Sequence, residues 1–321
     1  MTEHDGVAID GDDVPRIVVV GAAARDIAPD DPRGWRLGGG VSYGALTTAL
    51  LGVPTGAIVG VDAEAAHAPE LDLLRAAGVD VRLVRLQHGP IFENIETPGG
   101  RIQHSFGPSD PLPTSALPEE WRHAPGWMIA PVAAEVPDDW ADALPAGALV
   151  AVGWQGLLRE LRPRERVFHH PPGPSAIIRR ADLVGVSRDD FDADLPLAAL
   201  TSVMRPGAVL CVTRGARGGL AMTATQHGPE DMRSWPPIPP RRIVDATGAG
   251  DVFLAALLAA HTESRLVGGR LGQGFDLLLG AAAGSLVLEG HGLLGVAGRA
   301  ATAARMAEAP RHPHPEPEAQ H

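Results

Sequence analysis

Residues 242–254 read Arg-Ile-Val-Asp-Ala-Thr-Gly-Ala-Gly-Asp-Val-Phe-Leu, and this stretch decides how the rest of the chain is interpreted. It predicts a short apolar strand, a tight glycine-rich turn and a helix, because an apolar run rich in Ala and Leu continues to residue 260. Gly248 and Gly250 allow turn conformations that a Cβ would forbid, and they leave the backbone open to a ligand. Since the first N–H groups of a helix lack internal partners, such a turn favours an anion, phosphate above all.

Asp251 distinguishes this turn from an ordinary phosphate-binding turn. A carboxylate beside a phosphate is repelled, unless it accepts a proton from the hydroxyl that attacks the phosphate. The alternative is a plain strand–turn–helix junction with Asp251 as a helix cap. Gly-Ala-Gly-Asp alone supports both interpretations about equally, whereas the longer string Asp-x-Thr-Gly-Ala-Gly-Asp favours the first.

The full string resembles the C-terminal signature of the ribokinase-like (PfkB-type) carbohydrate kinases. This resemblance implies that Asp251 is the catalytic base. It also implies ATP with Mg²⁺ as the phosphoryl donor, and a candidate K⁺ site bordered by Asp245 and Thr247. The anion hole for the transferred phosphoryl group would be the backbone of Gly248, Ala249 and Gly250.

Composition excludes several other classes of protein. The 321 residues suffice for one large α/β domain, and a net charge of −12 argues against nucleic acid as a partner. The 27 basic residues are all arginine, so Schiff-base and Walker A lysines are excluded and any cation that meets a phosphate is Arg or a metal ion. A single Cys211 cannot form an internal disulfide. No signal peptide or membrane-spanning run is visible, so a cytoplasmic location is expected.

The residues that bind the phosphoryl acceptor are predicted near the N-terminus. Residues 17–21 form a buried strand of the parallel type, and Asp26 follows where ligands bind beyond the carboxyl ends of strands. An ordinary turn residue is an equal alternative for Asp26. Residues 37–46 resemble the family's N-terminal signature, in which Gly38 and Gly39 let the backbone approach a hydroxyl-rich substrate. Tyr43 stands where the family often has a sugar-binding Asn, which argues against simple ribose or fructose recognition.

A hairpin is predicted where residues 91–96 and 101–105 flank Pro-Gly-Gly. The resemblance implies that it is part of a small β-lid, with Phe92 and Arg101 facing the acceptor; an ordinary hairpin is the alternative. Two aromatic rings, Tyr43 and Phe92, would favour a ligand with a flat or apolar face. The resemblance also allows a homodimer through the lid.

The residues that bind the phosphoryl donor are predicted after two further strands. Ser187 and Asp190 replace the family's Asn-x-x-Glu, which acts on magnesium and phosphate through water; a capping box at a helix N-terminus is an equal alternative. Residues 213–219 resemble the turn beside the nucleotide, where Arg214 and Arg217 could supply charge in place of lysine; solvent-exposed turn arginines are an equal alternative. The matching nucleotide-binding residues are Thr213, Gly215 and Gly218. Residues 153–159 resemble a Gln-Gly-x-x-Arg segment of the myo-inositol and nucleoside kinase branch.

We therefore expect a three-layer α/β/α sandwich with a mostly parallel central sheet and a small β-lid. The predicted domain spans residues 15–300, with lid insertions at about 22–37 and 88–106. Residues 1–14 and a Pro/His/Glu-rich tail, 301–321, are predicted to be disordered. Helices are expected over residues 64–77, after the strand at 181–186, and over 271–288.

The predicted function is ATP-dependent phosphorylation of a hydroxyl on a small sugar, polyol, cyclitol or nucleoside, with nucleosides or cyclitols preferred to ribose or fructose. The alternative is a catalytically weak sugar- or nucleotide-binding protein on the same fold. A dinucleotide-dependent oxidoreductase is disfavoured because no Gly-x-Gly-x-x-Gly opens the first helix.

Overall fold

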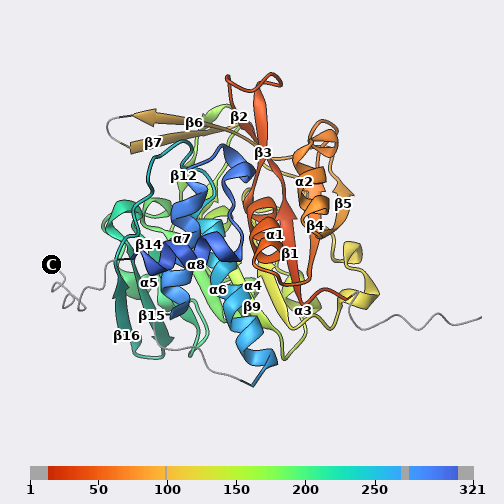
Figure 1. Cartoon of the computed structure of the whole chain (residues 1–321). Coiled ribbons are helices and arrows are strands. Elements are labelled where there is room, and N and C mark those ends of the chain that lie inside the picture. Colours follow the sequence, from red (N-terminus) through yellow and green to blue (C-terminus); the bar gives the residue numbers. More distant parts are fainter. Residues whose placement is uncertain (1–13, 98–99, 269–274, 310–321) are drawn as a thin grey trace, which may run out of the picture.

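The computed structural model describes residues 14–97, 100–268 and 275–309, and its centre is a nine-stranded sheet (Figure 1). The strands pair in parallel, except that β15 is antiparallel to both of its neighbours. In spatial order they are β16 (Gly228–Trp235), β15 (Gly219–Thr225), β14 (Val209–Thr213), β13 (Leu183–Ser187), β9 (Leu149–Gly153), β8 (Gly126–Ile129), β1 (Ile17–Ala22), β4 (Thr55–Val61) and β5 (Asp80–Arg85).

Both faces of the sheet are covered, which is why β1 is apolar throughout. Ile17 and Val19 belong to one buried cluster, and Val18 and Val20 belong to the other. The first cluster packs under α1 (Gly40–Leu50), α2 (Glu70–Ala76), α6 (Ala249–Leu266) and α7 (Phe275–Val287). The second packs under α3 (Trp140–Ala143), α4 (Ala176–Arg180) and α5 (Leu197–Thr201). These layers confirm the predicted three-layer α/β/α sandwich.

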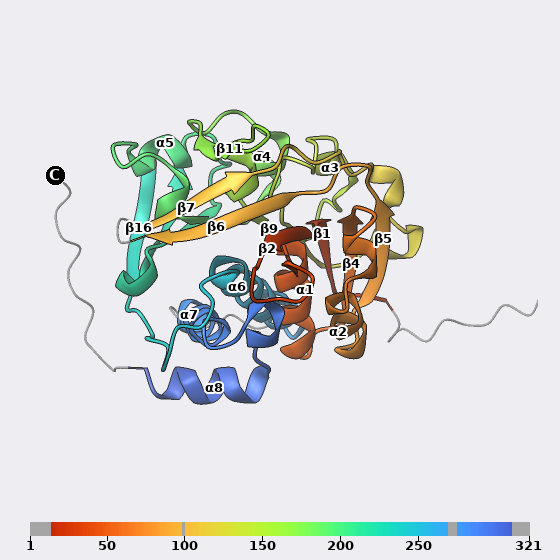
Figure 2. The ribbon, with the colours of Figure 1, turned by 90° about the horizontal axis from the view of Figure 1, so that it is seen from above.

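A second sheet of five strands forms the lid. Its order is β11 (Glu165–Arg166), β7 (Gly100–Ser105), β6 (Ile91–Thr97), β2 (Ala24–Ile27) and β3 (Trp35–Gly38). Because β2 begins two residues after β1 ends, the lid leaves the central sheet at its carboxyl edge, and Figure 2 shows β6 and β7 running across that end. A short pair, β10 (Arg159–Glu160) with β12 (Phe168–His169), lies on the same stretch of chain as β11.

Three predicted elements are wrong in detail. Residues 242–244 form no strand: Ile243 is 70% exposed, and the Val244 N–H donates to the carbonyl of Leu288 at 2.7 Å, so this segment is bound to the end of α7 instead of a sheet. The helix predicted from residue 64 begins only at Glu70, after a short 3₁₀ turn and Pro69. The helix predicted after β13 is a single 3₁₀ turn, η5 (Arg188–Asp190).

The predicted tail is also wrong over its first residues, because α8 (Arg299–Ala307) crosses the expected boundary at residue 300. Its Ala-rich sequence favours a helix. Arg305 of α8 is buried and donates to Ser285 and Glu289, each at 2.7 Å. The helix thereby packs against the end of α7. Residues 1–13 and 310–321, where disorder was predicted, lie outside the described residues.

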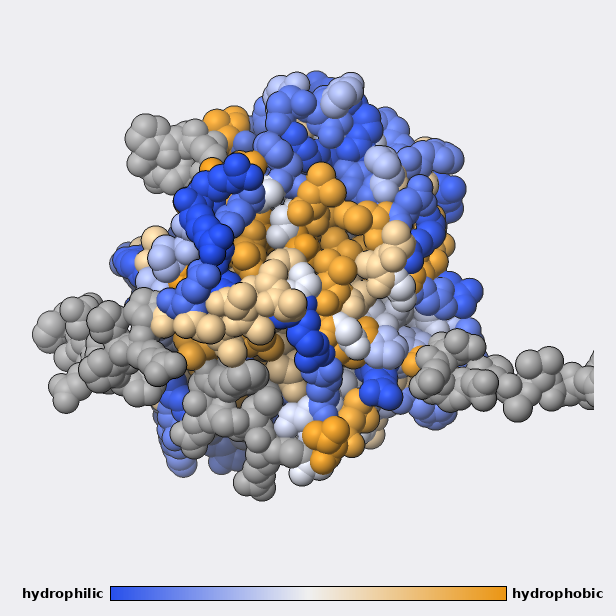
Figure 3. Space-filling model, in the orientation of Figure 1, coloured by the Kyte–Doolittle hydropathy of each residue, from blue (hydrophilic) through white to orange (hydrophobic). Residues whose placement is uncertain are grey.

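Apolar residues also reach the surface of the helical layer. On the face that carries α1, α7 and α8, they gather in the middle, with hydrophilic residues around them (Figure 3). Among the described helices, none has the length and hydropathy needed to cross a bilayer.

Candidate active site

The glycine-rich turn adopts the conformation that the sequence predicted at the start of α6. Gly248 is the N-cap with φ 81°, in the left-handed region. A Cβ on Gly248 would also collide with the ring of Tyr43, so no other residue fits there without strain. Gly250 differs, since a Cβ placed on it would meet no atom within 4 Å. The backbone of this turn is therefore fixed on the side of Tyr43 and open on the side of Gly250.

Asp251 lies in the first turn of α6, facing the N-terminus of α1. A Cβ on Gly40 would stand 2.8 Å from the Asp251 Oδ1 atom, and one on Gly153 would stand 3.9 Å from it. The side chain stays partly accessible, and no described residue donates a hydrogen bond to its carboxylate. Burial raises the pKa of Asp251 to about 7; the negative charge of Asp190 adds to the rise and Arg159 opposes it. The group is therefore partly accessible, accepts no hydrogen bond from the described residues, and has a pKa close to neutral.

Gly40 was missed by the sequence-based prediction. Gly38 and Gly39 were expected to admit substrate. However, a Cβ on Gly38 would collide with the Asp26 carboxylate. Gly39 has φ 90°, and a Cβ on it would stand 2.6 Å from the carbonyl oxygen of Ala22. These two glycines make room for protein atoms. The third glycine of the run, Gly40, makes room for the Asp251 carboxylate and for Ala130, and the run of three was the signal for it.

Asp190 is buried and approaches the same place from the end of β13. Its Oδ1 accepts a hydrogen bond from the Gln155 Nε2 at 2.9 Å, and its Oδ2 accepts one from the Ser187 N–H at 2.9 Å. The Ser187 hydroxyl in turn accepts from the N–H of Asp189 at 3.3 Å. The capping-box interpretation is thus confirmed, while the role of Ser187 and Asp190 toward a nucleotide stays a prediction.

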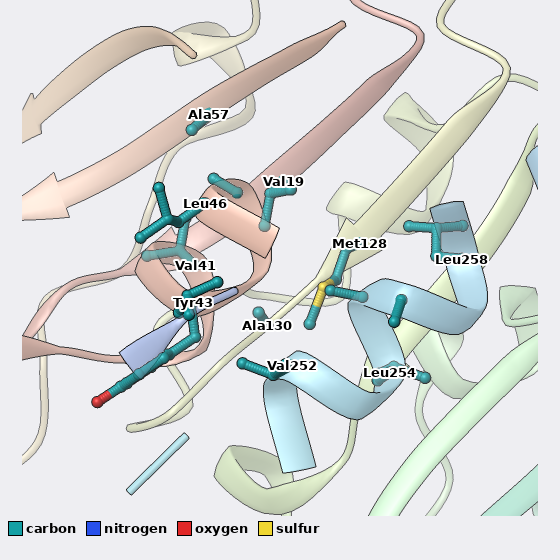
Figure 4. Close-up of a cluster of buried hydrophobic side chains, with 14 of the residues drawn as sticks. Val19, Val41, Tyr43, Leu46, Ala57, Met128, Ala130, Val252, Leu254 and Leu258 are labelled. Carbon is teal, nitrogen blue, oxygen red and sulfur yellow. The ribbon is translucent and has the colours of Figure 1, made fainter. Parts of the chain in front are cut away.

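Asp26 lies on β2, in the lid, and its charge reaches Arg159. The two aromatic residues expected at the acceptor are both buried: Tyr43 and Phe92 are each 2% exposed. Phe92 belongs to a small apolar cluster beneath the lid. Tyr43 sits at the end of the main cluster with its hydroxyl pointing away from it (Figure 4). Protein atoms cover most of both rings, so this structure shows no open aromatic face, and contact of Tyr43 or Phe92 with a substrate stays a prediction.

The remaining predicted residues lie around this centre. Asp245 accepts hydrogen bonds from Thr247 N–H at 2.9 Å and Gly292 N–H at 3.0 Å, so its oxygens hold the turn against a neighbouring loop. Thr213 ends β14. Gly215 and Gly218 have φ 54° and 73°, which the turn between β14 and β15 requires. The side chain of Arg101 lies outside the described part of the chain.

Arg159 was not among the predicted site residues, and the structure brings it to the centre. Its side chain is 9% exposed, and the charges of Asp190, Asp251 and Asp26 all act on it. Burial lowers the pKa of Arg159 and these carboxylates oppose that change. The Gln-Gly-x-x-Arg spacing was the signal that could have found it, since Gln155 of the same segment holds Asp190.

Known proteins resemble this chain in sequence over one part and in structure over most of its length. Residues 177–295 match the model of the pfkB family carbohydrate kinases. A pyrophosphate-dependent kinase in the ribokinase family, complexed with a pyrophosphate analog and myo-inositol, is 21% identical, with a TM-score of 0.67 over 86% of this chain and 96% of that chain. The nucleoside kinase of Methanocaldococcus jannaschii is 16% identical, with a TM-score of 0.64 over 92% and 99%. Ribokinase of Arabidopsis thaliana, complexed with ribose and ATP, is 19% identical, with a TM-score of 0.63 over 91% and 99%. No curated protein sequence matches the chain.

Proposed function

We propose that the protein transfers the γ-phosphoryl group of ATP to a hydroxyl of a small cyclitol, nucleoside or sugar, because residues 177–295 match the pfkB family model and most of the chain shares the fold of ribokinase-family kinases. The observation that carries this proposal is the Asp251 carboxylate, which has a pKa of about 7 and no hydrogen bond from any described residue. It stands one residue from the open backbone of Gly250. A base with these properties suits proton removal at neutral pH.

In the proposed reaction, Asp251 accepts the proton of the acceptor hydroxyl as the hydroxyl oxygen attacks the γ-phosphorus, and the bond from that phosphorus to the β,γ-bridging oxygen breaks so that ADP leaves. The N–H groups at the N-terminus of α6 receive the transferred phosphoryl group, where the helix dipole favours negative charge. Since the transition state for phosphoryl transfer is loose, holding donor and acceptor in line contributes more than the base itself.

The donor side is proposed to use Mg²⁺ and the turn after β14. Mg²⁺ usually binds one or two carboxylates together with substrate phosphates, and Asp190 is a buried carboxylate suited to act on it through water. Thr213, Gly215 and Gly218 would border the nucleotide. A K⁺ ion beside Asp245 and Thr247 remains a proposal as well. Pyrophosphate is the donor to test against ATP, because the family's fold also serves a pyrophosphate-dependent kinase.

The acceptor is proposed to be rich in hydroxyls and to lack a large flat face. Burial of Tyr43 and Phe92 removes the reason to expect stacking on a nucleobase. Asp26 is a carboxylate that can accept hydrogen bonds from hydroxyls. The Gln155 segment resembles one in the myo-inositol and nucleoside kinase branch, so a cyclitol is the first candidate and a nucleoside the second.

A matrix of donors and acceptors tests this proposal. Purified protein is assayed with ATP or pyrophosphate and Mg²⁺ against cyclitols, nucleosides, ribose and fructose, with Asp251→Asn as the control for contaminating kinases. We expect acceptor-dependent turnover that the Asn variant lacks, and a higher kcat/KM for a cyclitol or nucleoside than for ribose or fructose. Binding of acceptor and donor by thermal shift, without turnover in any pair, would instead establish the non-catalytic alternative.

A further inference from the structure

The guanidinium of Arg159 is buried without an ion pair. Within the described residues, no carboxylate oxygen comes within the 4.0 Å of a salt bridge, and the Nε atom has no hydrogen-bond partner. The Nη1 atom donates one long hydrogen bond, 3.4 Å, to the carbonyl of Val132. Arginine stays protonated in proteins, so this site holds a positive charge whose donors are mostly unused.

Such an arrangement costs stability unless an anion completes it. A buried charge is stable when it is paired, and an unpaired one loses its hydration without replacement. Four carboxylates have charges that reach Arg159, and they come from different parts of the chain: Asp190 from the end of β13, Asp251 from α6, Asp26 from the lid and Glu135 from the segment after β8. The guanidinium therefore stands near the point where the acceptor hydroxyl and the phosphoryl group would meet.

One lid residue holds Arg159 in this place. The guanidinium carbon lies 5.4 Å from the centre of the Phe92 ring, which is a cation–π contact, and Phe92 is on strand β6. The Val132 carbonyl, which accepts from Arg159, is held in place because the N–H groups of Val132 and Ala133 donate to the buried Glu135 carboxylate at 3.0 Å and 2.7 Å. Arg159 therefore contacts both a lid residue and the segment that follows β8.

We propose that Arg159 binds the transferred phosphoryl group through its unused guanidinium donors, and that Phe92 positions Arg159 so that this cation is in place when the lid covers the site. The proposal rests on the kinase function proposed above. It gives Phe92 a role other than contact with the acceptor. It also supplies the cation that the absence of lysine requires of arginine or a metal ion.

The chain offers a matched control for both residues. Arg162, three positions further on, lies 5.4 Å over the ring of Phe168, the same geometry at the same distance. Its side chain is 54% exposed and forms a salt bridge with Glu160 at 2.7 Å. Arg162→Met and Phe168→Leu therefore remove the same groups from a solvated, ion-paired setting.

The first measurement uses inorganic phosphate as the probe and needs no turnover. Stabilisation by a ligand rises with its concentration relative to Kd, so the thermal shift between 0 and high phosphate reports affinity. We expect Arg159→Met to weaken phosphate binding at least tenfold, Arg159→Lys to weaken it less, and Arg162→Met to leave it unchanged. Phosphate affinity within twofold of wild type in both Arg159 variants would overturn the proposal, whatever the protein catalyses.

The second measurement uses kinetics. We expect Arg159→Met to lower kcat about 100-fold and to move the acid limb of the pH profile toward higher pH, because the Arg159 charge lowers the pKa of Asp251.

Phe92→Leu should lower kcat about tenfold, with the KM for the acceptor little changed. Phe92→Tyr should restore kcat, and Phe168→Leu should leave kcat unchanged. A Phe92→Leu variant that changes only the melting temperature would refute the positioning role. Failure of the wild type to phosphorylate any acceptor would refute the proposed function but leave the phosphate measurement decisive for Arg159.

Discussion

The first turn of α6 and the turn after β13 each bring a carboxylate to the same site, but they hold it differently. Asp190, after β13, accepts hydrogen bonds from Gln155 and from Ser187, both at 2.9 Å. Asp251, on α6, accepts none from the described residues and remains partly accessible. One carboxylate is fixed by its neighbours as part of the framework, and the other keeps its lone pairs for a ligand.

This difference shows why a string of residue types is not enough to assign a role. Both aspartates stand beside the N-terminus of a helical turn, where an acidic side chain is expected for capping or for the helix dipole. Capping occurs at Asp190. At Asp251 the neighbouring positions are glycines, Gly40 and Gly153, so neither neighbour has a side chain that could cap or cover the carboxylate. Space and missing partners, more than residue type, mark the reactive group.

The largest expected effect comes from removing the base. Asp251→Asn keeps the shape and abolishes proton acceptance, so kcat should fall about 10²- to 10⁴-fold, the usual contribution of a general base. Donor affinity should stay near that of the wild type, measured by titration of an ATP analogue. Asp190→Asn should cost far less in kcat; equal losses in the two variants would contradict the division of roles between the aspartates.

The same substitution should stabilise the protein above neutral pH. Because the native pKa of Asp251 is raised to about 7 from 3.8, the native state binds a proton that the unfolded chain releases. The contribution of Asp251 to wild-type stability should therefore decline as pH rises from about 4 to about 7 and then level off. Asp251→Asn should lack this decline, so its melting temperature should exceed that of the wild type by a margin that grows with pH. A constant margin across this range would show that the pKa is not raised.

Alanine substitutions at the two glycines of the turn at α6 should have different effects: Gly248→Ala should lower stability, and Gly250→Ala should lower activity. Gly248→Ala puts a Cβ at φ 81° and against the Tyr43 ring, so it should lower the free energy of unfolding by about 1–3 kcal/mol. Gly250→Ala meets no atom within 4 Å and should leave stability unchanged or slightly higher, while its methyl group obstructs the phosphoryl site and lowers kcat/KM. Urea unfolding of both variants measures the first effect, and assays measure the second. Destabilisation of the Gly250 variant would mean that the open side of the turn is packed.

A smaller effect should appear in the pH profile. The charge of Asp190 raises the pKa of Asp251, so Asp190→Asn should move the acid limb of kcat/KM to lower pH. In the wild type this limb should fall below about pH 7, as Asp251 becomes protonated. Gln155→Leu is the companion variant, since it removes a neutral partner of Asp190 and keeps the charge. If the limb moves equally in both variants, the shift reflects altered structure and not charge.

The smallest expected effect is at the cap itself. Ser187→Ala removes the acceptor of the Asp189 N–H and should cost about 0.5–1 kcal/mol of unfolding free energy, near the low end for caps because η5 has only three residues. Ser202→Ala, at an exposed serine bonded to the carbonyl of Ala199, is the control. A loss of kcat much greater than the loss of stability would indicate that Ser187 acts on the donor.

The sequence by itself determined the fold class, because uninterrupted apolar strands such as residues 17–20 can only be buried on both faces. It also pointed to the turn at residues 248–251, since glycine conformations and helix ends are local properties of the chain. It failed where local pattern and tertiary setting disagree. Residues 242–244 have strand-like side chains, but they form no strand, and the Val244 N–H bonds to the carbonyl of Leu288 at the end of α7.

Only the tertiary structure decided which groups meet. Arg159 and Phe92 are 67 positions apart and come together because the lid folds back over the carboxyl edge of the central sheet. Tyr43 and Gly248 meet because α1 and α6 pack side by side, and that contact places the Tyr43 ring against the glycine-rich turn. The raised pKa of Asp251 likewise needs the burial and the charge that distant segments supply. Sequence spacing specifies distances along the chain, whereas desolvation and charge act through space, so these properties follow from the fold alone.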